Sequence, residues 1–346
     1  MKRLGRREWV IFLLFCWTAA GSQPVWAAQP CVFVITGDTV REIGPAAGEQ
    51  VAQSQGMVAL ADVLLEEEIF SPTALASFSD GSEAEVSLQG FLAWQGGSAD
   101  FLDPDGNRRP GMVGIWLDPP ERSITQLMPE ALVALSEGRV LIILLDGLGY
   151  FELMNVQPPF LASRQVEQAR TVYPPISPVA LGSIVTGELP SVHGITARGE
   201  RDLKAPDLFS AAAALGRTAA MVEGSTKLVN TSIRPLLNPD LDADGSTDGE
   251  VLRAALEQLE MGVDLVFVHF HGYDDAAHTC GPFTPEAAEK LLELDRCVAR
   301  LCEGFAGTVF VLADHGQHPS AGDKLGDHGE FCPLDLTIPW VKWRQP

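Results

Sequence analysis

Predominantly apolar runs alternate with helical segments through the second half of the chain. The apolar runs are Val140–Leu145, Thr218–Val222, Leu265–Phe270 and Thr308–Ala313. Such runs are typical of strands that are covered on both faces. Between them, apolar residues recur at helical spacing in Leu208–Leu215, Glu250–Glu260 and Pro285–Cys302. The alternation predicts an α/β fold with a central, mostly parallel sheet flanked by helices.

The first part of the chain has a different pattern. Short alternating runs such as Val32–Thr36 and Glu85–Leu88 are interrupted by Gly, Pro and Asp-Gly, which is typical of β-strands joined by turns. Within them, residues 60–68 predict one helix, and Asp103-Pro-Asp-Gly-Asn predicts a turn. We therefore expect a small β-rich domain over residues 29–130, whose role the sequence does not indicate, and a catalytic domain over residues 131–346.

Residues 1–28 resemble a secretory signal peptide. Four basic residues, Lys2, Arg3, Arg6 and Arg7, precede the apolar run Val10–Cys16, and Val25-Trp-Ala-Ala is a small-residue cleavage site. The alternative is an uncleaved membrane anchor, but the apolar run is shorter than the roughly 20 residues that a spanning helix needs. We expect an exported protein, secreted, periplasmic or at the cell surface, with no stable membrane span after cleavage.

Composition narrows the range of ligands. Lys and Arg number 24 against 46 Asp and Glu, a formal net charge of −22, so binding to nucleic acid through phosphate neutralisation is not expected. An anionic substrate must be bound by a few local groups. Five cysteines remain beyond residue 28, an odd number that does not suggest a disulfide framework. A Cys280–Cys332 bridge stays open, whereas Cys297 and Cys302 lie in a predicted helix as small apolar residues.

Carboxylates and histidines gather after the predicted strands. Asp146 and Asp314 directly follow two of the apolar runs, and Asp274 comes shortly after a third. Carboxyl ends of parallel strands face one crevice, so the three acids should converge, although each alone could belong to a simple turn. All seven histidines lie between residues 193 and 328, and His278, His315 and His328 are near these acids. Imidazole and carboxylate are ligands of Zn²⁺ and similar ions, so we predict a metal site.

A candidate nucleophile lies between two of these strands. Ser177 precedes Pro178 and a short apolar stretch that ends at Gly187, which predicts a helix with Ser177 as its N-cap. The N–H groups at a helix N-terminus attract phosphate, and a neighbouring metal would lower the pKa of the hydroxyl. Ser177 is thus either a cap alone or also a nucleophile.

Five short motifs in a fixed order resemble the alkaline phosphatase superfamily. They are Leu-Leu-Asp146-Gly, Ser177 with Ser-Ile-Val-Thr-Gly and Pro-Ser-Val-His193-Gly-Ile, Asp274-Asp-Ala-Ala-His278, Ala-Asp314-His315-Gly, and His328-Gly. The chain is most similar to the type I phosphodiesterase/nucleotide pyrophosphatase branch, over roughly residues 139–342. The resemblance implies an alkaline phosphatase-like fold and an enzyme that hydrolyses small phosphoric esters.

The same resemblance implies two divalent metal ions and a covalent phosphoseryl intermediate on Ser177. Asp274, His278 and His328 would bind one ion, and Asp146, Asp314, His315 and Ser177 the other. These ligands favour zinc, and manganese also fits. The remaining histidines are not assigned to either metal ion. Of His269 and His271, one is expected to line the pocket and the other to pack in the core. His318 has no assigned role, and His193 is expected to be structural.

Two departures from the branch leave the substrate open. Its members generally have Thr where this chain has Ser177, and an Asn where counting from the nucleophile reaches Arg198. An Arg can bind two phosphate oxygens, which suits a monoester better than a diester. Arg198 could instead be a solvated loop residue, with Arg201 or Lys227 in its place.

Other functions remain as alternatives. A sulfatase of this fold would have an Arg two residues after the Pro of its nucleophile motif, which is absent here, and a cytoplasmic-type phosphomutase fits poorly with a signal peptide. A non-catalytic exported protein that binds metal or a partner would be expected to lack some ligands. Residues 240–248 resemble the first half of a calcium-binding loop, but Val251 stands where a bidentate Glu is required, so a turn leading into a helix near Thr247 is preferred.

Overall fold

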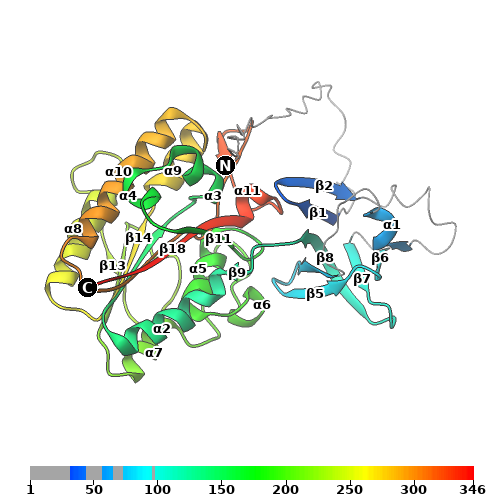
Figure 1. The fold of residues 1–346 in the computed structure, drawn as a ribbon, viewed down its shortest axis with the longest axis horizontal. Helices are drawn as coiled ribbons and strands as arrows, with labels where there is room; N and C mark the ends of the chain where they lie inside the picture. Colours follow the sequence, from blue (N-terminus) through cyan, green and yellow to red (C-terminus); the bar gives the residue numbers. More distant parts are fainter. Residues whose placement is uncertain (1–31, 44–56, 65–72, 96–97) are drawn as a thin grey trace, which may run out of the picture.

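The computed structural model describes residues 32–43, 57–64, 73–95 and 98–346. Two sheets, one in each part of the chain, organise these residues (Figure 1). The predicted signal peptide at residues 1–28 lies outside the described residues. Within the described ranges, the structure contains no helix whose length and hydropathy would suit a membrane span.

The first sheet builds the β-rich domain. Its strands are β1 (Val32–Thr36), β2 (Thr39–Ile43), β3 (Met57–Ala59), β4 (Thr73–Phe78), β5 (Glu83–Ser87), β6 (Phe91–Gln95), β7 (Ser98–Leu102) and β8 (Arg108–Leu117). They run in the order β2-β1-β8-β7-β6-β3, and β4 joins β5 to β8. Only β1 and β8 pair in parallel among these strands. The sheet confirms the predicted β-rich region.

Local predictions in this domain are confirmed in part. The predicted turn forms, because the Gly106 N–H donates to the Asp103 carbonyl at 3.0 Å. The helix expected over residues 60–68 is α1 (Leu60–Val63), and residues 65–68 lie outside the described residues.

The second sheet has eight strands in the order β13-β12-β14-β10-β15-β18-β11-β9. They are β9 (Arg122–Ser123), β10 (Val140–Leu145), β11 (Val166–Arg170), β12 (Ala219–Glu223), β13 (Leu236–Leu237), β14 (Leu265–Phe270), β15 (Gly307–Leu312) and β18 (Thr337–Gln345). The first five strands in this order, β13, β12, β14, β10 and β15, are parallel. β18 pairs antiparallel with both β15 and β11. β10 and β14 are buried along their whole length, as the apolar runs predict.

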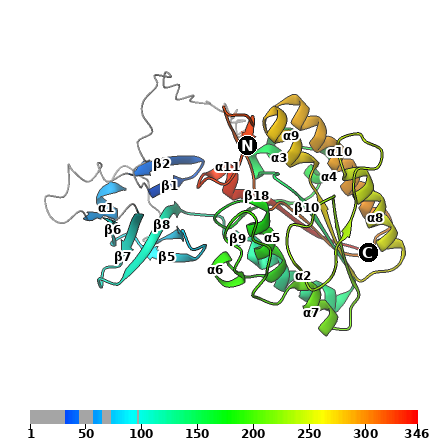
Figure 2. The same cartoon turned by 180° about the vertical axis from the view of Figure 1, so that it is seen from behind.

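Helices cover both faces of this sheet (Figures 1 and 2). One layer contains α2 (Leu127–Glu137), α5 (Ser177–Thr186), α6 (Pro190–His193) and α7 (Leu208–Ala214). The other contains α3 (Tyr150–Val156), α4 (Pro159–Ala162), α8 (Asp248–Glu260), α9 (Gly272–Cys280) and α10 (Pro285–Cys302). A 3₁₀ turn at Ile124–Gln126, the short pair β16 (His318–Pro319) and β17 (Gly326–Asp327), and α11 (Pro333–Leu336) complete the domain. The predicted α/β architecture is confirmed.

The two domains meet close to the carboxyl ends of the parallel strands. Phe331, in the loop before α11, packs with Ile35 and Trp116 of the first domain in a small apolar cluster. A Cβ on Gly114 of β8 would lie 2.3 Å from the Phe331 ring, so this contact requires glycine. Across the same boundary, Arg170 and Glu83 lie 3.9 Å apart. The β-rich domain therefore supports the loop that carries His328.

Candidate active site

The three predicted acids meet at the carboxyl ends of β10, β14 and β15, as parallel-strand geometry requires. Asp146 follows β10, Asp314 follows β15, and Asp274 lies in the first turn of α9, directly after β14. The N–H of Gly147 donates to Asp314 Oδ1 at 3.0 Å and so joins two of the loops. Gly147 has φ 70°, and a Cβ there would lie 2.7 Å from Asp274 Oδ1. The turn after β10 therefore depends on glycine to bring the carboxylates together.

Ser177, Asp146, Asp314 and His315 form one group of side chains. The Oγ of Ser177 lies 3.1 Å from His315 Nε2 and 3.4 Å from Asp146 Oδ1. His315 Nε2 also lies 3.5 Å from Asp146 Oδ1 and 3.4 Å from Asp314 Oδ2. Ligand atoms that share one metal ion at about 2.0–2.2 Å have similar mutual separations. The predicted ligand set of the second ion is thus gathered around one point.

Asp274, His278 and His328 form an adjoining group. The Nε2 atoms of His278 and His328 lie 3.4 Å and 3.8 Å from the two oxygens of Asp274. His328 stacks on His315 with ring centroids 3.8 Å apart, so the two groups share a wall. Asp274, His315 and His328 also offer ligand atoms within 4.8 Å of one another. The geometry brings together all seven residues that were predicted as ligands.

Backbone carbonyls orient the three predicted ligand histidines. The Nδ1 atoms of His278, His315 and His328 lie 2.7 Å, 3.1 Å and 3.0 Å from the carbonyl oxygens of Gly326, Gly316 and Pro175. A carbonyl accepts only from an N–H, so Nδ1 carries the proton in each ring. Nε2 is therefore the nitrogen of each ring that is left to coordinate a cation, in place of the side chains that contact it here, as in metal sites whose histidines are fixed by their other nitrogen.

Ser177 does not cap the helix, contrary to the N-cap prediction. Helix α5 begins at Ser177 itself, Ile176 is the N-cap residue, and Pro178 is the second helical residue. The Ser177 hydroxyl consequently points to Asp146 and His315 rather than to a backbone N–H. The predicted stop at Gly187, with φ 72°, is confirmed. The shift by one residue leaves the hydroxyl available for chemistry.

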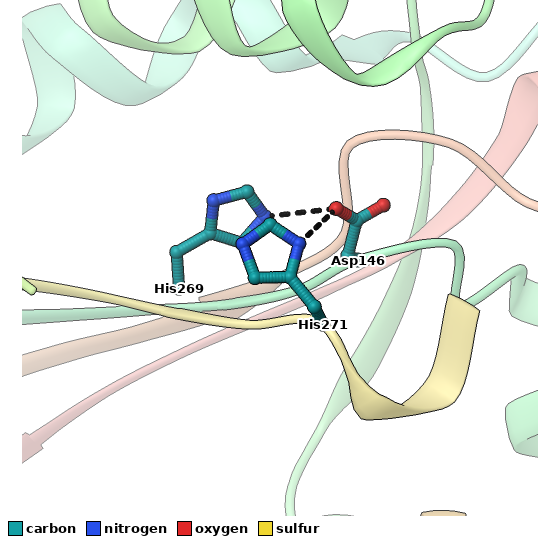
Figure 3. A group of neighbouring side chains, drawn as sticks. All are labelled: Asp146, His269 and His271. Carbon is teal, nitrogen blue, oxygen red and sulfur yellow. Dashed lines mark hydrogen bonds and ion pairs between the residues drawn. The ribbon is translucent and has the colours of Figure 1, made fainter. Parts of the chain in front are cut away.

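His269 and His271 both contact Asp146 (Figure 3). His269 is fully buried, as expected of the histidine that packs in the core, and His271 is partly exposed. His269 Nε2 and His271 Nδ1 lie 3.1 Å and 2.8 Å from Asp146 Oδ2. His269 lies in β14, and His271 follows that strand as the N-cap residue of α9. Asp146 thus uses one oxygen toward Ser177 and the other toward two imidazoles.

The charge distribution in the group suits a bound cation. Burial, together with the negative charge of Asp146, raises the pKa of Asp274 well above its usual range, and the same causes raise the pKa of Asp314. Against the cost of burial, the hydrogen bonds from His269 and His271 hold the pKa of Asp146 well below its usual range. Burial lowers the pKa of His328 to about 2, which keeps this ring neutral and able to coordinate. Asp314 Oδ2 is buried without a hydrogen-bond partner, so the residues present fit a divalent cation.

Four further side chains lie at the site. Gln317, Glu223 and Lys324 were not predicted there, and the position of Arg198 had been left open. Gln317 Nε2 donates to Asp274 Oδ1 at 2.7 Å, and Glu223 at the end of β12 lies 3.6 Å from His269 Nδ1. Two cationic groups reach the rim: Arg198 Nη2 is 3.5 Å from His328 Nε2, and Lys324 Nζ is 3.0 Å from His278 Nε2. Arg198 is an exposed loop residue whose guanidinium reaches the rim of the site.

Glu152 in α3 supports Gln317 and has an unusual charge state. It is fully buried, its Oε1 accepts from the Gln317 N–H at 3.3 Å, and its Oε2 has no hydrogen-bond partner. Burial raises the pKa of Glu152 from 4.5 to about 8. The folded protein therefore keeps a proton on this carboxyl over a pH range in which the unfolded chain has lost it.

This shift predicts a pH-dependent effect of Glu152→Gln on the free energy of unfolding. The acid's pKa is raised in the folded state, so its contribution to stability falls as the pH rises from about 4.5 to about 8. Urea unfolding should show the variant and the wild type equally stable near pH 5, and the variant more stable by a few kcal/mol near pH 9. Glu289→Gln, at an exposed position of α10, is the control and should show no such difference. A constant offset at both pH values would contradict a protonated Glu152.

Two smaller expectations can be compared with the structure. The thiols of Cys280 and Cys332 are free, so the Cys280–Cys332 bridge is wrong. Cys280 ends α9, where its Sγ donates to the Ala276 carbonyl, and Cys332 lies beside His318 and Asp335. His193 is buried and bonded to Ser183 at 3.0 Å, as expected of a structural residue.

The acidic loop after β13 precedes α8, whose N-cap residue is Thr247, as predicted. Asp240, Asp242 and Asp244 approach one another there, and their oxygens accept backbone N–H groups of the same loop. The structure therefore agrees with the predicted turn leading into a helix.

Comparison with known proteins identifies a family whose model matches the chain. The family model described as type I phosphodiesterase/nucleotide pyrophosphatase matches residues 140–342. The catalytic subunit of human GPI ethanolamine phosphate transferase 3 is 33% identical over 101 residues, which are 28% of this chain and 8% of that protein. The Schizosaccharomyces pombe GPI ethanolamine phosphate transferase 3 is 29% identical over 87 residues, or 24% of this chain and 9% of that protein. The chain thus matches less than a tenth of the length of these curated relatives.

Solved structures show weaker likeness. A phosphonoacetate hydrolase from Sinorhizobium meliloti 1021, in complex with phosphonoformate, is 22% identical with a TM-score of 0.43, over 53% of this chain and 57% of that one. Murine ectonucleotide pyrophosphatase/phosphodiesterase 5 is 17% identical with a TM-score of 0.44, over 53% and 58%. The family match covers more than half of the chain and includes every predicted ligand. The chain belongs to the type I phosphodiesterase/nucleotide pyrophosphatase family.

Proposed function

We propose that the protein hydrolyses small phosphate monoesters through Ser177, at a site that holds two divalent cations. The observation that carries this proposal is the position of the Ser177 hydroxyl, 3.1 Å from His315 Nε2 and 3.4 Å from Asp146 Oδ1 at the beginning of α5. A nucleophile needs such neighbours, because a free hydroxyl is a weak nucleophile at neutral pH. The partial positive charge at the start of α5 also favours a phosphate next to Ser177.

Asp274, His278 and His328 would hold one cation, and Asp146, Asp314, His315 and Ser177 the other. Zinc is the ion that these ligands favour, and manganese also fits. Two such ions would neutralise phosphate oxygens and stabilise charge on the attacking and leaving oxygens. His269 and His271 would orient Asp146 through its second oxygen, in the way that outer hydrogen bonds commonly fix metal-binding carboxylates.

The covalent step uses only Ser177, the ester and water. The Ser177 Oγ forms a bond to phosphorus as the bond between phosphorus and the leaving oxygen breaks, and the proton lost by the hydroxyl is balanced by one taken up by the leaving oxygen, which departs as an alcohol. A water oxygen then bonds to phosphorus while the Oγ–P bond breaks, one water proton returns to the serine Oγ, and the other stays with the phosphate that leaves. Both steps place the reacting phosphorus next to the first turn of α5.

Two cationic side chains support a monoester as the preferred substrate. Arg198 and Lys324 each lie within 3.5 Å of a predicted ligand histidine, His328 and His278. A monoester carries one more negative charge than a diester near neutral pH, and a guanidinium can bind two of its oxygens. Arg198 is therefore proposed as the phosphate-binding arginine.

Arg198→Ala tests this assignment. We expect kcat/KM for p-nitrophenyl phosphate to fall about 10- to 100-fold, because a charge-assisted contact contributes about 1.5–3 kcal/mol. The rate with bis-p-nitrophenyl phosphate should change less. Exposed Arg296 of α10 supplies the control, since Arg296→Ala should leave both rates unchanged. Activity should disappear after chelation and return with zinc or manganese. A wild-type enzyme that cleaves the diester faster, with equal effects of Arg198→Ala on both substrates, would identify a phosphodiesterase instead.

We also propose that the enzyme is exported, with residues 1–27 or 1–28 removed. The basic start, the apolar run and the small residues before Gln29 support this proposal. The N-terminus of the protein isolated from outside the cytoplasm should then be Ala28 or Gln29.

A further inference from the structure

A second group of metal-ligating side chains lies outside the proposed catalytic site. His318 in β16, Cys332 before α11 and Asp335 within α11 place one nitrogen, one sulfur and one oxygen within 4.8 Å of one another. None of these residues belongs to the predicted catalytic ligand set. They come from two loops that are adjacent in space and separated by 13 residues in the sequence.

Each of these side chains is held by neighbours in an orientation suitable for coordination. Asp335 is fully buried, its Oδ1 lies 2.8 Å from His318 Nδ1, and its Oδ2 accepts from the Glu330 N–H at 2.9 Å. The other nitrogen of His318 lies 3.7 Å from Glu330 Oε1. An ion bound at His318 Nδ1 would leave Nε2 facing the Glu330 carboxylate, beyond direct hydrogen-bond distance. Glu330 therefore acts as an outer partner or completes the ligand set.

The donor atoms of the group suit a metal cation. Two carboxylates, Asp335 and Glu330, and the thiol of Cys332 surround a single imidazole. A thiol that coordinates a metal ion loses its proton on binding. Mixed nitrogen, sulfur and oxygen ligands are typical of zinc, with ligand distances of about 2.0–2.3 Å.

We propose that His318, Cys332 and Asp335 bind a structural zinc ion, with Glu330 or water as the fourth ligand. His318 is three residues beyond His315, and Cys332 is four residues beyond His328. Between His328 and Cys332 lies Phe331, which packs against Ile35 and Trp116 of the β-rich domain. The ion would join the two loops that carry His315 and His328 and would fix the contact between the domains.

Cobalt substitution tests the proposal, because this site contains a sulfur ligand and the predicted catalytic ligands are nitrogen and oxygen only. The purified full chain, stripped of metal and titrated with Co²⁺, should bind three ions and show a thiolate-to-cobalt charge-transfer band in the near ultraviolet. Cys332→Ser should lose this band and one bound ion, and its melting temperature in the presence of metal should fall. Cys280→Ser is the matched control, because Cys280 is another half-buried free thiol, and it should retain both signals.

The wild-type spectrum decides the question even if a variant folds poorly. A folded, hydrolytically active wild-type protein that binds only two Co²⁺ ions without a charge-transfer band would overturn this inference and leave the proposed function intact. A band that persists in Cys332→Ser would overturn it as well. Conversely, an inactive protein that still shows the Cys332-dependent band would support the structural site while contradicting the proposed hydrolysis.

Discussion

Ser177→Ala is expected to lower kcat for phosphate ester hydrolysis by at least about 10³-fold, because it removes the atom that attacks phosphorus. The lost hydroxyl lies at the surface of the metal-ligand group rather than in an apolar core, so folding should be retained. Initial rates with p-nitrophenyl phosphate, together with circular dichroism and metal content, measure the two effects separately.

Two further variants test whether the loss of turnover is specific to the Ser177 hydroxyl. Ser177→Thr keeps a hydroxyl at the start of α5 and should retain measurable turnover. Ser191→Ala, at an exposed position of α6, should behave as wild type. If Ser177→Ala kept its metal and lost less than tenfold in turnover, the serine would not be the nucleophile, and attack by water alone would have to be considered.

Asp146→Asn should have the second large effect, because this carboxylate serves both halves of the site. Its Oδ1 faces Ser177 and His315, and its Oδ2 faces His269 and His271. Against the cost of burial, Asp146 and Glu223 raise the pKa of His269 to about 10, so the ring is positively charged in the metal-free protein. Asparagine keeps the size of the side chain and removes the charge, which leaves this buried imidazolium with one acidic partner fewer.

We expect Asp146→Asn to lose at least one metal ion and about 10²-fold or more in turnover. In metal-free protein, the free energy of unfolding should fall by about 3–5 kcal/mol, as when one partner of a buried ion pair is removed. Metal analysis and urea unfolding are the measurements, with the exposed turn residue Asp105→Asn as control. Full metal content with normal turnover in Asp146→Asn would show that the carboxylate is not a ligand.

The central part of the fold could be predicted because its strands are buried on both faces. Val140–Leu145 and Leu265–Phe270 agree with β10 and β14 to the residue, since a continuous apolar run has sharp polar ends. The antiparallel strands β11 and β18 were not predicted. β11 has the sequence Val-Glu-Gln-Ala-Arg, in which only one residue is fully buried, so its pairing depends on tertiary context more than on its own pattern.

Metal ligands could be predicted from the sequence where they follow a recognisable strand. The orientation of the other side chains at the site could not. Asp146 and Asp314 are positioned by the strands they terminate, so chain order sufficed. Gln317 and Lys324 reach the site from loops after β15, where no periodic pattern indicates direction. The predicted start of α5 was wrong by one residue, since Ser177 is the first helical residue and not the N-cap. Pro178 is favourable at either of the first two helical positions, and the sequence does not distinguish them.

Detection of a covalent intermediate on Ser177 tests the central claim most directly. The enzyme would be mixed with excess p-nitrophenyl phosphate, quenched in acid within the first turnovers, and analysed by intact-mass and peptide mass spectrometry. The account predicts a mass increase of one phosphoryl group on the peptide that contains Ser177, absent in Ser177→Ala and in chelated enzyme. Steady hydrolysis by wild-type enzyme with no adduct on Ser177, and with an active Ser177→Ala variant, would contradict the account.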